Sequence, residues 1–277
     1  MAFETNFETI LYEVKDRVAT ITLNRPDRYN AITAQMGEDL GRAWSEVKRD
    51  PQVVCVIVTG AGAKALCTGM DVADVASGRA KRSPEAAEMK RQDQPWFKLT
   101  AIQNRCWKPV ITAVNGMVVG GGLHFVADSD LVIAAEHATF FDTHVKVGLI
   151  SGIEPVGLAR RIPLEAVMRM SLLGGSERMG VEEALRVGLV GEVVPAERLM
   201  ERARELAGKI AEHSPTALAR SKQVIWESLE GGLDAGIENA WRTIVKHNAC
   251  PDLEEGAKAF VEKREPQWAP LSELSEE

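Results

Sequence analysis

The sequence predicts a layered α/β fold with a helical C-terminal third. Continuous apolar runs of strand length occur at Val53–Gly60, Val110–Val114 and Leu131–Ala135, and glycine-bearing loops and helical patterns separate them. Such runs are typical of strands that are covered on both faces. After Pro155 strand patterns become rare and helical periodicity dominates, which indicates a region built mainly of helices.

The N-terminal segment is expected to form a hairpin followed by a helix. Residues 10–23 hold two short β-rich runs broken at Lys15 and Asp16, and the second run alternates with the period of a strand. Thr33 suits the N-cap of a helix of about four turns, because apolar residues then recur at helical spacing. A second helical stretch is predicted from Pro84 to Cys106, and a short helix is predicted to end at Asp128.

The C-terminal third is expected to be a helical module. A strand signal remains only around Leu189 to Val194, and helical periodicity marks residues 199–210, 215–229, 236–248 and 253–263. We therefore expect a core over residues 1–195 and a helical module over 196–277. Since no low-complexity linker separates them, they are expected to fold as one unit. The module would cover the site or bind another copy of the chain.

Composition excludes several classes of protein. The net charge of −7 argues against nucleic acid as a partner, because phosphate-backbone binding needs a concentrated basic face. The four cysteines follow no CxxC or framework spacing, which favours a reducing cytoplasm over a disulfide scaffold. The N-terminus carries acids rather than the bases of a signal peptide, and no apolar stretch has the length of a membrane span. No membrane partner is expected.

Two glycine-bearing turns, at residues 66–71 and 115–124, each follow a buried strand. Glycine allows the backbone to approach a ligand closely, and the free N–H groups at the start of a helix attract negative charge. Two convergent N–H donors would form an oxyanion hole. The alternative is that both turns are merely tight. A dinucleotide site is disfavoured, since no G-x-G-x-x-G opens a first βα unit.

The two turns lie within a wider resemblance to a known protein family. Segments distributed in order over nearly the whole chain resemble the signature blocks of the crotonase (enoyl-CoA hydratase/isomerase) superfamily, namely LNRPDRYNAI, ALCTGMDVADV, KPVITAVNGMVVGGGLHF, SDLVIAAEHATF, VGLISG and AFVEKREPQW. The resemblance implies a spiral of ββα units with a helical oligomerisation region. It also implies an acyl-CoA thioester as substrate, no cofactor beyond the CoA of that substrate, and a homotrimer or hexamer.

The resemblance also implies roles for individual residues. The N–H groups of Met70 and Gly121 would hold the thioester oxygen and stabilise an enolate. Substrate contacts would further involve residues of two loops and of the last helix. These are Arg28 and Lys64 near the CoA nucleotide, Thr68 and Asp71 beside Met70, and Phe260 and Lys263 at the adenine-phosphate end, the last two in a neighbouring subunit.

The sequence departs from the family at the two catalytic positions. A typical hydratase carries a glutamate on the helix after the GGG turn and a second about twenty residues later, where this chain has His124 and His144. Imidazole, with a pKa of about 6.5 against about 4.3 for a glutamate, differs in charge at neutral pH. We therefore expect the two histidines to act as general base and acid around the enolate.

Several acidic residues could assist these histidines. Asp128 lies four residues after His124 on the predicted helix and could orient it. Asp142 or Glu154 could serve His144, although the more common role of a glutamate followed by proline, as at Glu154, is to cap the next helix. A zinc ion held by both histidines matches no established spacing, so no metal is expected.

Three functions stay open within this frame. An atypical hydratase or isomerase is favoured, because the GGG turn is intact. His144 also resembles the histidine of the family's β-diketone hydrolases, which cleave C–C bonds by retro-Claisen chemistry. The third alternative is a non-catalytic acyl-CoA-binding protein that has lost both carboxylates.

Overall fold

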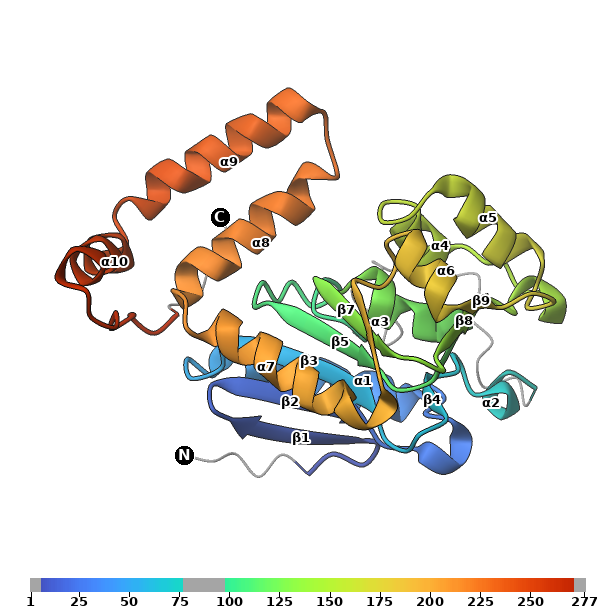
Figure 1. The fold of residues 1–277 in the computed structure, drawn as a ribbon. Helices are drawn as coiled ribbons and strands as arrows, with labels where there is room; N and C mark the ends of the chain where they lie inside the picture. Colours follow the sequence, from blue (N-terminus) through green and yellow to red (C-terminus); the bar gives the residue numbers. More distant parts are fainter. Residues whose placement is uncertain (1–5, 77–97, 272–277) are drawn as a thin grey trace.

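The computed structural model describes residues 6–76 and 98–271, which form two sheets surrounded by helices (Figure 1). The larger sheet has the strand order β1 (Ile10–Lys15), β2 (Val18–Leu23), β3 (Cys55–Gly60), β5 (Val110–Val114), β7 (Leu131–Ala135), β10 (Glu192–Val194). The smaller sheet has the order β4 (Ala65–Cys67), β6 (Met117–Val119), β8 (Thr139–Phe141), β9 (Met179–Gly180).

Three consecutive repeats build both sheets at once. In each repeat a strand of the large sheet (β3, β5 or β7) leads into a strand of the small sheet (β4, β6 or β8) and then into a helix. These helices are α2 (Val72–Ala76), α3 (His124–Ala127), which a 3₁₀ turn over Gly120–Leu123 precedes, and α4 (Ile153–Leu158). Strands of successive repeats pair in parallel within each sheet. The expected spiral of ββα units is confirmed.

The N-terminal prediction is also confirmed. β1 and β2 pair antiparallel from Ile10 with Leu23 to Lys15 with Val18. Helix α1 (Ala34–Arg49) begins after Thr33, whose hydroxyl accepts a hydrogen bond from the Met36 N–H. This cap satisfies one of the donors that a helix start leaves unpaired.

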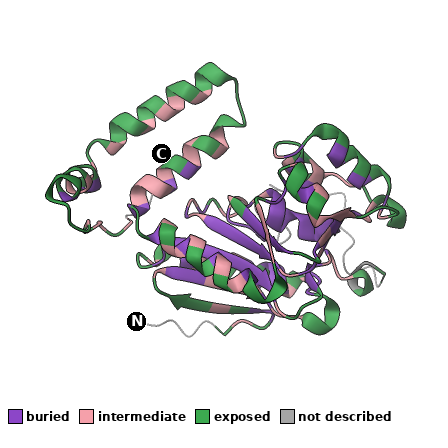
Figure 2. Ribbon diagram, in the orientation of Figure 1, coloured by how far each residue is buried: buried purple, intermediate pink, exposed green. Residues whose placement is uncertain are grey.

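Helix α7 (Leu199–Ala211) completes the core. Its small residues Ala203 and Ala207 are fully buried and pack with Ile57 and Ile111 of the large sheet. Buried residues, purple in Figure 2, concentrate in the central strands of this sheet. Helix α7 falls within the expected helical module of residues 196–277, yet it packs on the core. Of the described helices of this module, only those after α7 project from the core.

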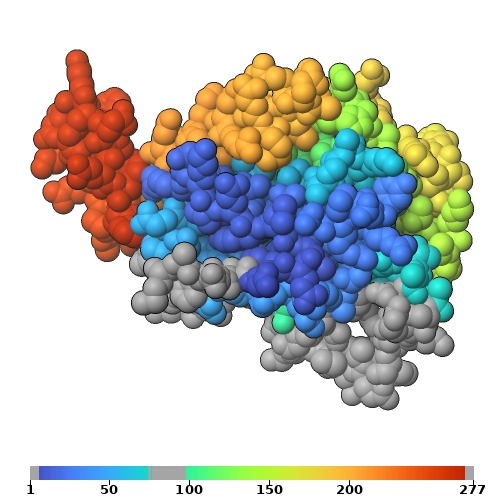
Figure 3. All heavy atoms as spheres, turned by 90° about the horizontal axis from the view of Figure 1, so that it is seen from below, coloured from blue at the N-terminus to red at the C-terminus, as the bar shows by residue number. Residues whose placement is uncertain are grey.

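Helices α8 (Pro215–Ser228), α9 (Leu233–His247) and α10 (Pro251–Glu262) extend away from the sheets, as Figures 1 and 3 show. Asp130 holds α8 on the core, because its carboxylate lies 2.7 Å from both Lys222 Nζ and Trp226 Nε1. The same carboxylate accepts the Val110 N–H at the start of β5. A charged, three-donor contact of this kind fixes the direction in which the module leaves the core.

One sequence expectation needs correction, and three short strands were not expected. Residues 98–106, the described part of the helix predicted from Pro84 to Cys106, form turns rather than a helix, while residues 84–97 lie outside the described residues. The short strands β4, β6 and β8 were not predicted as strands, because a run of three residues is too short to show a periodicity. The remaining helices are α5 (Leu164–Leu172) and α6 (Val181–Arg186). None of the helices described is long and apolar enough to cross a membrane.

Candidate active site

The loop after β4 presents one backbone N–H of the predicted oxyanion hole. Ile32 and Met70 form an isolated parallel bridge, in which the Ile32 N–H donates to Gly69 O and the Asp71 N–H donates to Ile32 O. Successive N–H groups of an extended chain point to opposite sides. The Met70 N–H therefore points away from Ile32.

The second predicted donor lies against the same loop. Gly121 is the second residue of the 3₁₀ turn that precedes α3, so its N–H has no acceptor within the turn. A Cβ atom placed on Gly121 would lie 3.5 Å from the Gly69 Cα atom, which puts the two backbones in van der Waals contact. The structure thus brings the two glycine-bearing turns of the sequence together.

Gly69 is the position that makes this approach possible. Its φ is +80°, and a Cβ there would lie 2.9 Å from both Gly121 N and Val119 O. Gly69→Ala is expected to lower kcat/KM by roughly a hundredfold or more, because displacing one oxyanion donor costs about that much. Steady-state kinetics on an acyl-CoA ester would measure it.

Gly188→Ala is the matched control for that change. Gly188 has a φ of +82° with no atom within 4 Å of the added Cβ, so the variant carries the backbone strain without the clash. Its kcat/KM is expected to stay near that of the wild type. Equal activity of the two alanine variants would contradict the role given to the approach of Gly69 and Gly121.

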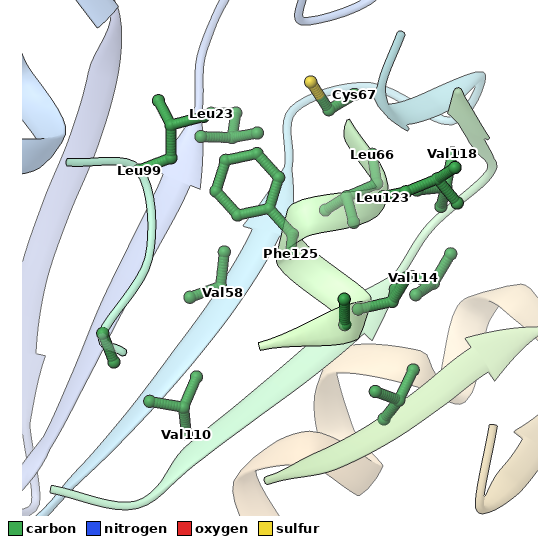
Figure 4. Close-up of a cluster of buried hydrophobic side chains, with 14 of the residues drawn as sticks. Leu23, Val58, Leu66, Cys67, Leu99, Val110, Val114, Val118, Leu123 and Phe125 are labelled. Atoms are coloured by element: carbon green, nitrogen blue, oxygen red, sulfur yellow. The ribbon is translucent and has the colours of Figure 1, made fainter. Parts of the chain in front are cut away.

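The core fixes the residues around His124. Leu123 and Phe125, which flank it, are buried and point into the cluster with Leu66 and Leu99 in Figure 4. His124 itself is buried, with 5% of its surface exposed. The histidine therefore has little freedom to reorient.

Both ring nitrogens of His124 lie close to protein groups. Nδ1 is 3.2 Å from Gln103 Nε2, and Nε2 is 3.3 Å from Glu154 Oε1. Asp128, the predicted orienter, lies farther off, with 3.9 Å between its Oδ2 atom and His124 Nδ1, and it accepts a 2.7 Å hydrogen bond from the Thr100 hydroxyl. The hydrogen-bonding partner at Nδ1 is thus Gln103 and not Asp128.

Glu154 does not have the helix-capping role that the sequence suggested for it. The N-cap of α4 is Gly152, and no side chain caps this helix. Glu154 is buried, and its Oε1 atom lies 3.7 Å from the position of a Cβ on Gly121. A carboxylate therefore lies beside the predicted oxyanion donor, although neither aligned catalytic position carries one.

His144 forms a second couple with Asp142. Its Nδ1 lies 2.6 Å from Asp142 Oδ1, and its backbone N–H donates to the same oxygen at 2.8 Å. Asp142 is fully buried and also accepts a short hydrogen bond from the Ser151 hydroxyl. Since a carboxylate only accepts, His144 Nδ1 carries a proton and Nε2 is the atom that gains or loses one.

The couple shifts the proton affinity of both partners. The hydrogen bond to Asp142 raises the pKa of His144, against the opposing effect of burial. Burial would raise the pKa of Asp142, but its hydrogen bonds from His144 and Ser151 outweigh that effect and lower it. The His144 ring also lies against the glycine turn, with Cε1 3.4 Å from the Cβ position of Gly120. An imidazole of raised pKa and a carboxylate thus lie next to neighbouring glycines.

Comparison with known proteins identifies the scaffold. The sequence profile described as enoyl-CoA hydratase/isomerase matches residues 13–270. The chain belongs to the enoyl-CoA hydratase/isomerase family. It is thus a member of the crotonase superfamily and an acyl-CoA-processing enzyme of the hydratase/isomerase type.

Relatives of this enoyl-CoA hydratase/isomerase family member span almost its full length. An (E)-benzylidenesuccinyl-CoA hydratase of Thauera aromatica is 37% identical, over 94% of this chain and 98% of its own length. The carnitinyl-CoA dehydratase of Escherichia coli strain K12 is 34% identical, over 91% of this chain and 94% of its own length. An enoyl-CoA hydratase/isomerase structure from Mycobacterium paratuberculosis has a TM-score of 0.83 at 38% identity, covering 96% of this chain and all of the other.

Four predicted substrate contacts of this hydratase/isomerase lie together, on the 3₁₀ turn Pro26–Arg28 and on the loops before and after β4. Arg28 is exposed, and Lys64 Nζ lies 5.8 Å from the centre of the neighbouring Tyr29 ring. The Thr68 hydroxyl donates to Tyr29 O at 3.3 Å. Asp71 holds the loop in shape, because it pairs with Arg25 at 3.1 Å and accepts the Ala73 N–H.

Phe260 and Lys263 are not brought to these loops within one chain. Phe260 lies on α10 with 86% of its surface exposed, and Lys263 ends that helix in the left-handed conformation. Figure 1 shows α10 at the far end of the projecting helices. Their role in a neighbouring subunit's site stays a prediction.

Gln103, Ser151 and Arg25 contribute to the site without a preceding signal in the sequence. Each acts through a hydrogen bond to a residue that the motifs had marked, namely His124, Asp142 and Asp71. Over the described part of the chain, no group of three His, Cys, Asp or Glu side chains is arranged to hold a metal ion.

Proposed function

We propose that this enzyme adds water reversibly to the double bond of an enoyl-CoA thioester, with Glu154 as general base and His144 as general acid. The observation that carries the proposal is the position of the Glu154 carboxylate, 3.7 Å from the Cβ position of Gly121. In this proposal Glu154 supplies the carboxylate that positions 124 and 144 lack.

The mechanism divides the proton transfers between the two couples. Water attacks the β-carbon while Glu154 accepts its proton, and the electron pair of the double bond moves onto the thioester oxygen. The Met70 and Gly121 N–H groups hold this enolate oxygen, where each donor is worth about 2.7–4 kcal/mol of barrier. His144 then donates a proton from Nε2 to the α-carbon as the enolate collapses. Glu154 releases its proton to solvent and His144 takes one up from solvent, which restores both groups.

We propose a role for His124 other than the proton transfer predicted from the sequence. Gln103 and Glu154 occupy its two ring nitrogens, at 3.2 and 3.3 Å. A histidine enclosed in this way orients its neighbours rather than contacting substrate. We therefore assign His124 to the positioning of the Glu154 carboxylate.

A panel of thioesters tests the proposal by mass spectrometry. It contains crotonyl-CoA, benzylidenesuccinyl-CoA, a 3-enoyl-CoA and a CoA ester that bears a β-diketone. Hydration of either of the first two esters is expected. Cleavage of the diketone alone would support the retro-Claisen alternative, to which an Asp142–His144 couple is also suited. Binding without turnover of any ester would support a non-catalytic acyl-CoA-binding protein.

The pH dependence of hydration is expected to follow the Asp142–His144 couple. Because the pKa of His144 is raised and the protonated form is the donor, the rate should fall as pH rises through this elevated value. Asp142→Asn removes the negative charge that stabilises the imidazolium, so this alkaline limb should move to lower pH. Profiles of kcat/KM for both proteins would measure the shift. An unchanged limb in Asp142→Asn would argue against His144 as the acid.

We also propose that the projecting helices bind other copies of the chain, in a trimer or hexamer. Helix α9 has no buried residue within the chain as described, and its Leu233 and Trp241 are 79% and 61% exposed. Apolar surface of this kind marks an interface. Sedimentation velocity is expected to show an oligomer, and a monomer at micromolar concentration would contradict the proposal.

The four cysteines are free, as a reducing compartment such as the cytoplasm maintains.

A further inference from the structure

The turn over residues 99–104 is a fixed element beside the site. The Leu99 carbonyl accepts a 3.0 Å hydrogen bond from the indole N–H of Trp44, which is fully buried in α1. Thr100 is also buried and donates to Asp128 at the end of α3. Because Trp44, Leu99 and Thr100 are all buried, the turn holds a constant position relative to α1 and α3.

The orientation of the Gln103 amide in this turn is determined by the backbone. Its Oε1 atom lies 2.8 Å from the Leu99 N–H. A backbone N–H only donates, so the carbonyl oxygen of the amide must face it and the amide nitrogen must face the other way. The amide nitrogen therefore faces His124 Nδ1, at 3.2 Å.

An amide nitrogen also only donates, so His124 Nδ1 must be the acceptor and must carry no proton. The single ring proton is then on Nε2, which lies 3.3 Å from Glu154 Oε1. Two carboxylates lie near the ring, and Asp128 would favour a proton on Nδ1. That carboxylate is 3.9 Å away and already accepts the Thr100 hydroxyl, so the amide of Gln103 decides the tautomer.

We propose that Gln103 is a positioning residue, which fixes His124 as the neutral Nε2–H tautomer and so directs an N–H at the Glu154 carboxylate. A carboxylate that accepts a hydrogen bond from an N–H donor is held in one orientation. The catalytic consequence rests on the proposed function, in which Glu154 is the base. The tautomer itself does not depend on that function.

Nuclear magnetic resonance of the full chain labelled with ¹⁵N-histidine tests the tautomer directly. The chain has only five histidines, and the His124 signal is assigned by its loss in His124→Gln. In the wild type at pH 7 to 8 the proton is expected on Nε2, with Nδ1 unprotonated. A proton on Nδ1, or on both nitrogens, would overturn the inference.

Two substitutions at Gln103 change the donor while keeping the shape of the side chain. Gln103→Met removes the N–H donor and is expected to give a mixture of His124 tautomers. Gln103→Glu replaces the donor with an acceptor and is expected to place a proton on Nδ1. Retention of the wild-type tautomer in both variants would show that Gln103 does not set it.

Asn104→Ala is the matched control on the same turn. The Asn104 side chain donates to Lys98 O at 2.9 Å and to Thr100 O at 2.8 Å, without contacting His124. Its loss perturbs the turn but leaves the donor of Gln103 in place, so the His124 tautomer should not change. A shift equal to that of Gln103→Met would mean that any damage to the turn suffices, which contradicts a specific role for Gln103.

Kinetics separate this inference from the proposed function. Gln103→Met is expected to lower kcat at least roughly tenfold while KM stays within about twofold, as is typical when an orienting hydrogen bond is lost. If the tautomer responds to Gln103 as expected but Glu154→Gln retains full activity, the proposed base is wrong and the Gln103 inference stands. The opposite result is an inactive Glu154→Gln variant together with a His124 tautomer that stays the same in the Gln103 variants. It would support the proposed base and overturn the role of Gln103.

Discussion

Replacing Glu154 with glutamine is expected to lower kcat by roughly 10²–10⁴-fold, the usual contribution of a positioned general base. Glutamine keeps the size of the side chain and an oxygen that can face His124 Nε2, which lies 3.3 Å from the carboxylate in the wild type. The fold and the binding of the acyl-CoA ester should therefore survive. Steady-state kinetics with the most active ester of the panel, together with thermal melting, would measure both effects.

Glu165→Gln is the control for that substitution. Glu165 lies in the first turn of α5, is exposed, and carries the same chemical change outside the site. Its kcat is expected to match that of the wild type. If Glu154→Gln also turned over at the wild-type rate, the base would have to be another group, and the proposed mechanism would fail at its first step.

Replacing His144 with alanine is expected to lower kcat by a similar factor of roughly 10²–10⁴, because the proton donor to the α-carbon is lost. Affinity for the CoA ester should change little, since the predicted nucleotide contacts Arg28 and Lys64 lie on other loops. The alkaline limb of the pH profile should disappear with the imidazole. Stopped-flow or steady-state rates across pH 6 to 9, with a separate binding measurement, would test all three expectations.

His213→Ala provides the comparison for His144→Ala. His213 is exposed in the turn between α7 and α8, and it belongs to neither glycine turn. Its variant should retain the wild-type rate and pH profile. Full activity of His144→Ala would remove the histidine from the mechanism and leave Asp142 as part of a purely structural contact.

The two substitutions together also distinguish hydration from isomerisation. Addition of water needs a base for the water and an acid for the α-carbon, so both Glu154→Gln and His144→Ala should be inactive. Moving a double bond along the acyl chain needs a single group that removes a proton at one carbon and returns it at another. Loss of activity in only one of the two variants would therefore favour an isomerase.

The position of the carboxylate explains how the site differs from the family pattern. The chain carries histidines where the resemblance places two glutamates, yet a glutamate from α4 lies beside Gly121. One of the histidines, His124, contacts this glutamate, and the other pairs with Asp142. The site thus contains one carboxylate and one imidazole of raised pKa next to the glycine turn.

Much of the fold could be predicted from local patterns. The apolar runs of β3, β5 and β7 report burial on both faces, and Thr33 marks the start of α1, because these features depend on neighbouring residues only. The three-residue strands of the small sheet could not be predicted, since their conformation depends on pairing with segments far along the chain. The absence of a helix at residues 98–106 has the same origin, because buried contacts with α1 and α3 hold that turn.

The sequence by itself determined the family, the two glycine turns and the presence of histidine at positions 124 and 144. It also made Asp142 a candidate partner of His144, two residues away, where the chain can bring them together locally. Only the tertiary structure decided that His124 faces Glu154, thirty residues later, and Gln103, twenty-one residues earlier. Periodicity reports which side of an element is buried, whereas the identity of a distant partner depends on how the strands and helices pack, and that packing is a property of the whole chain.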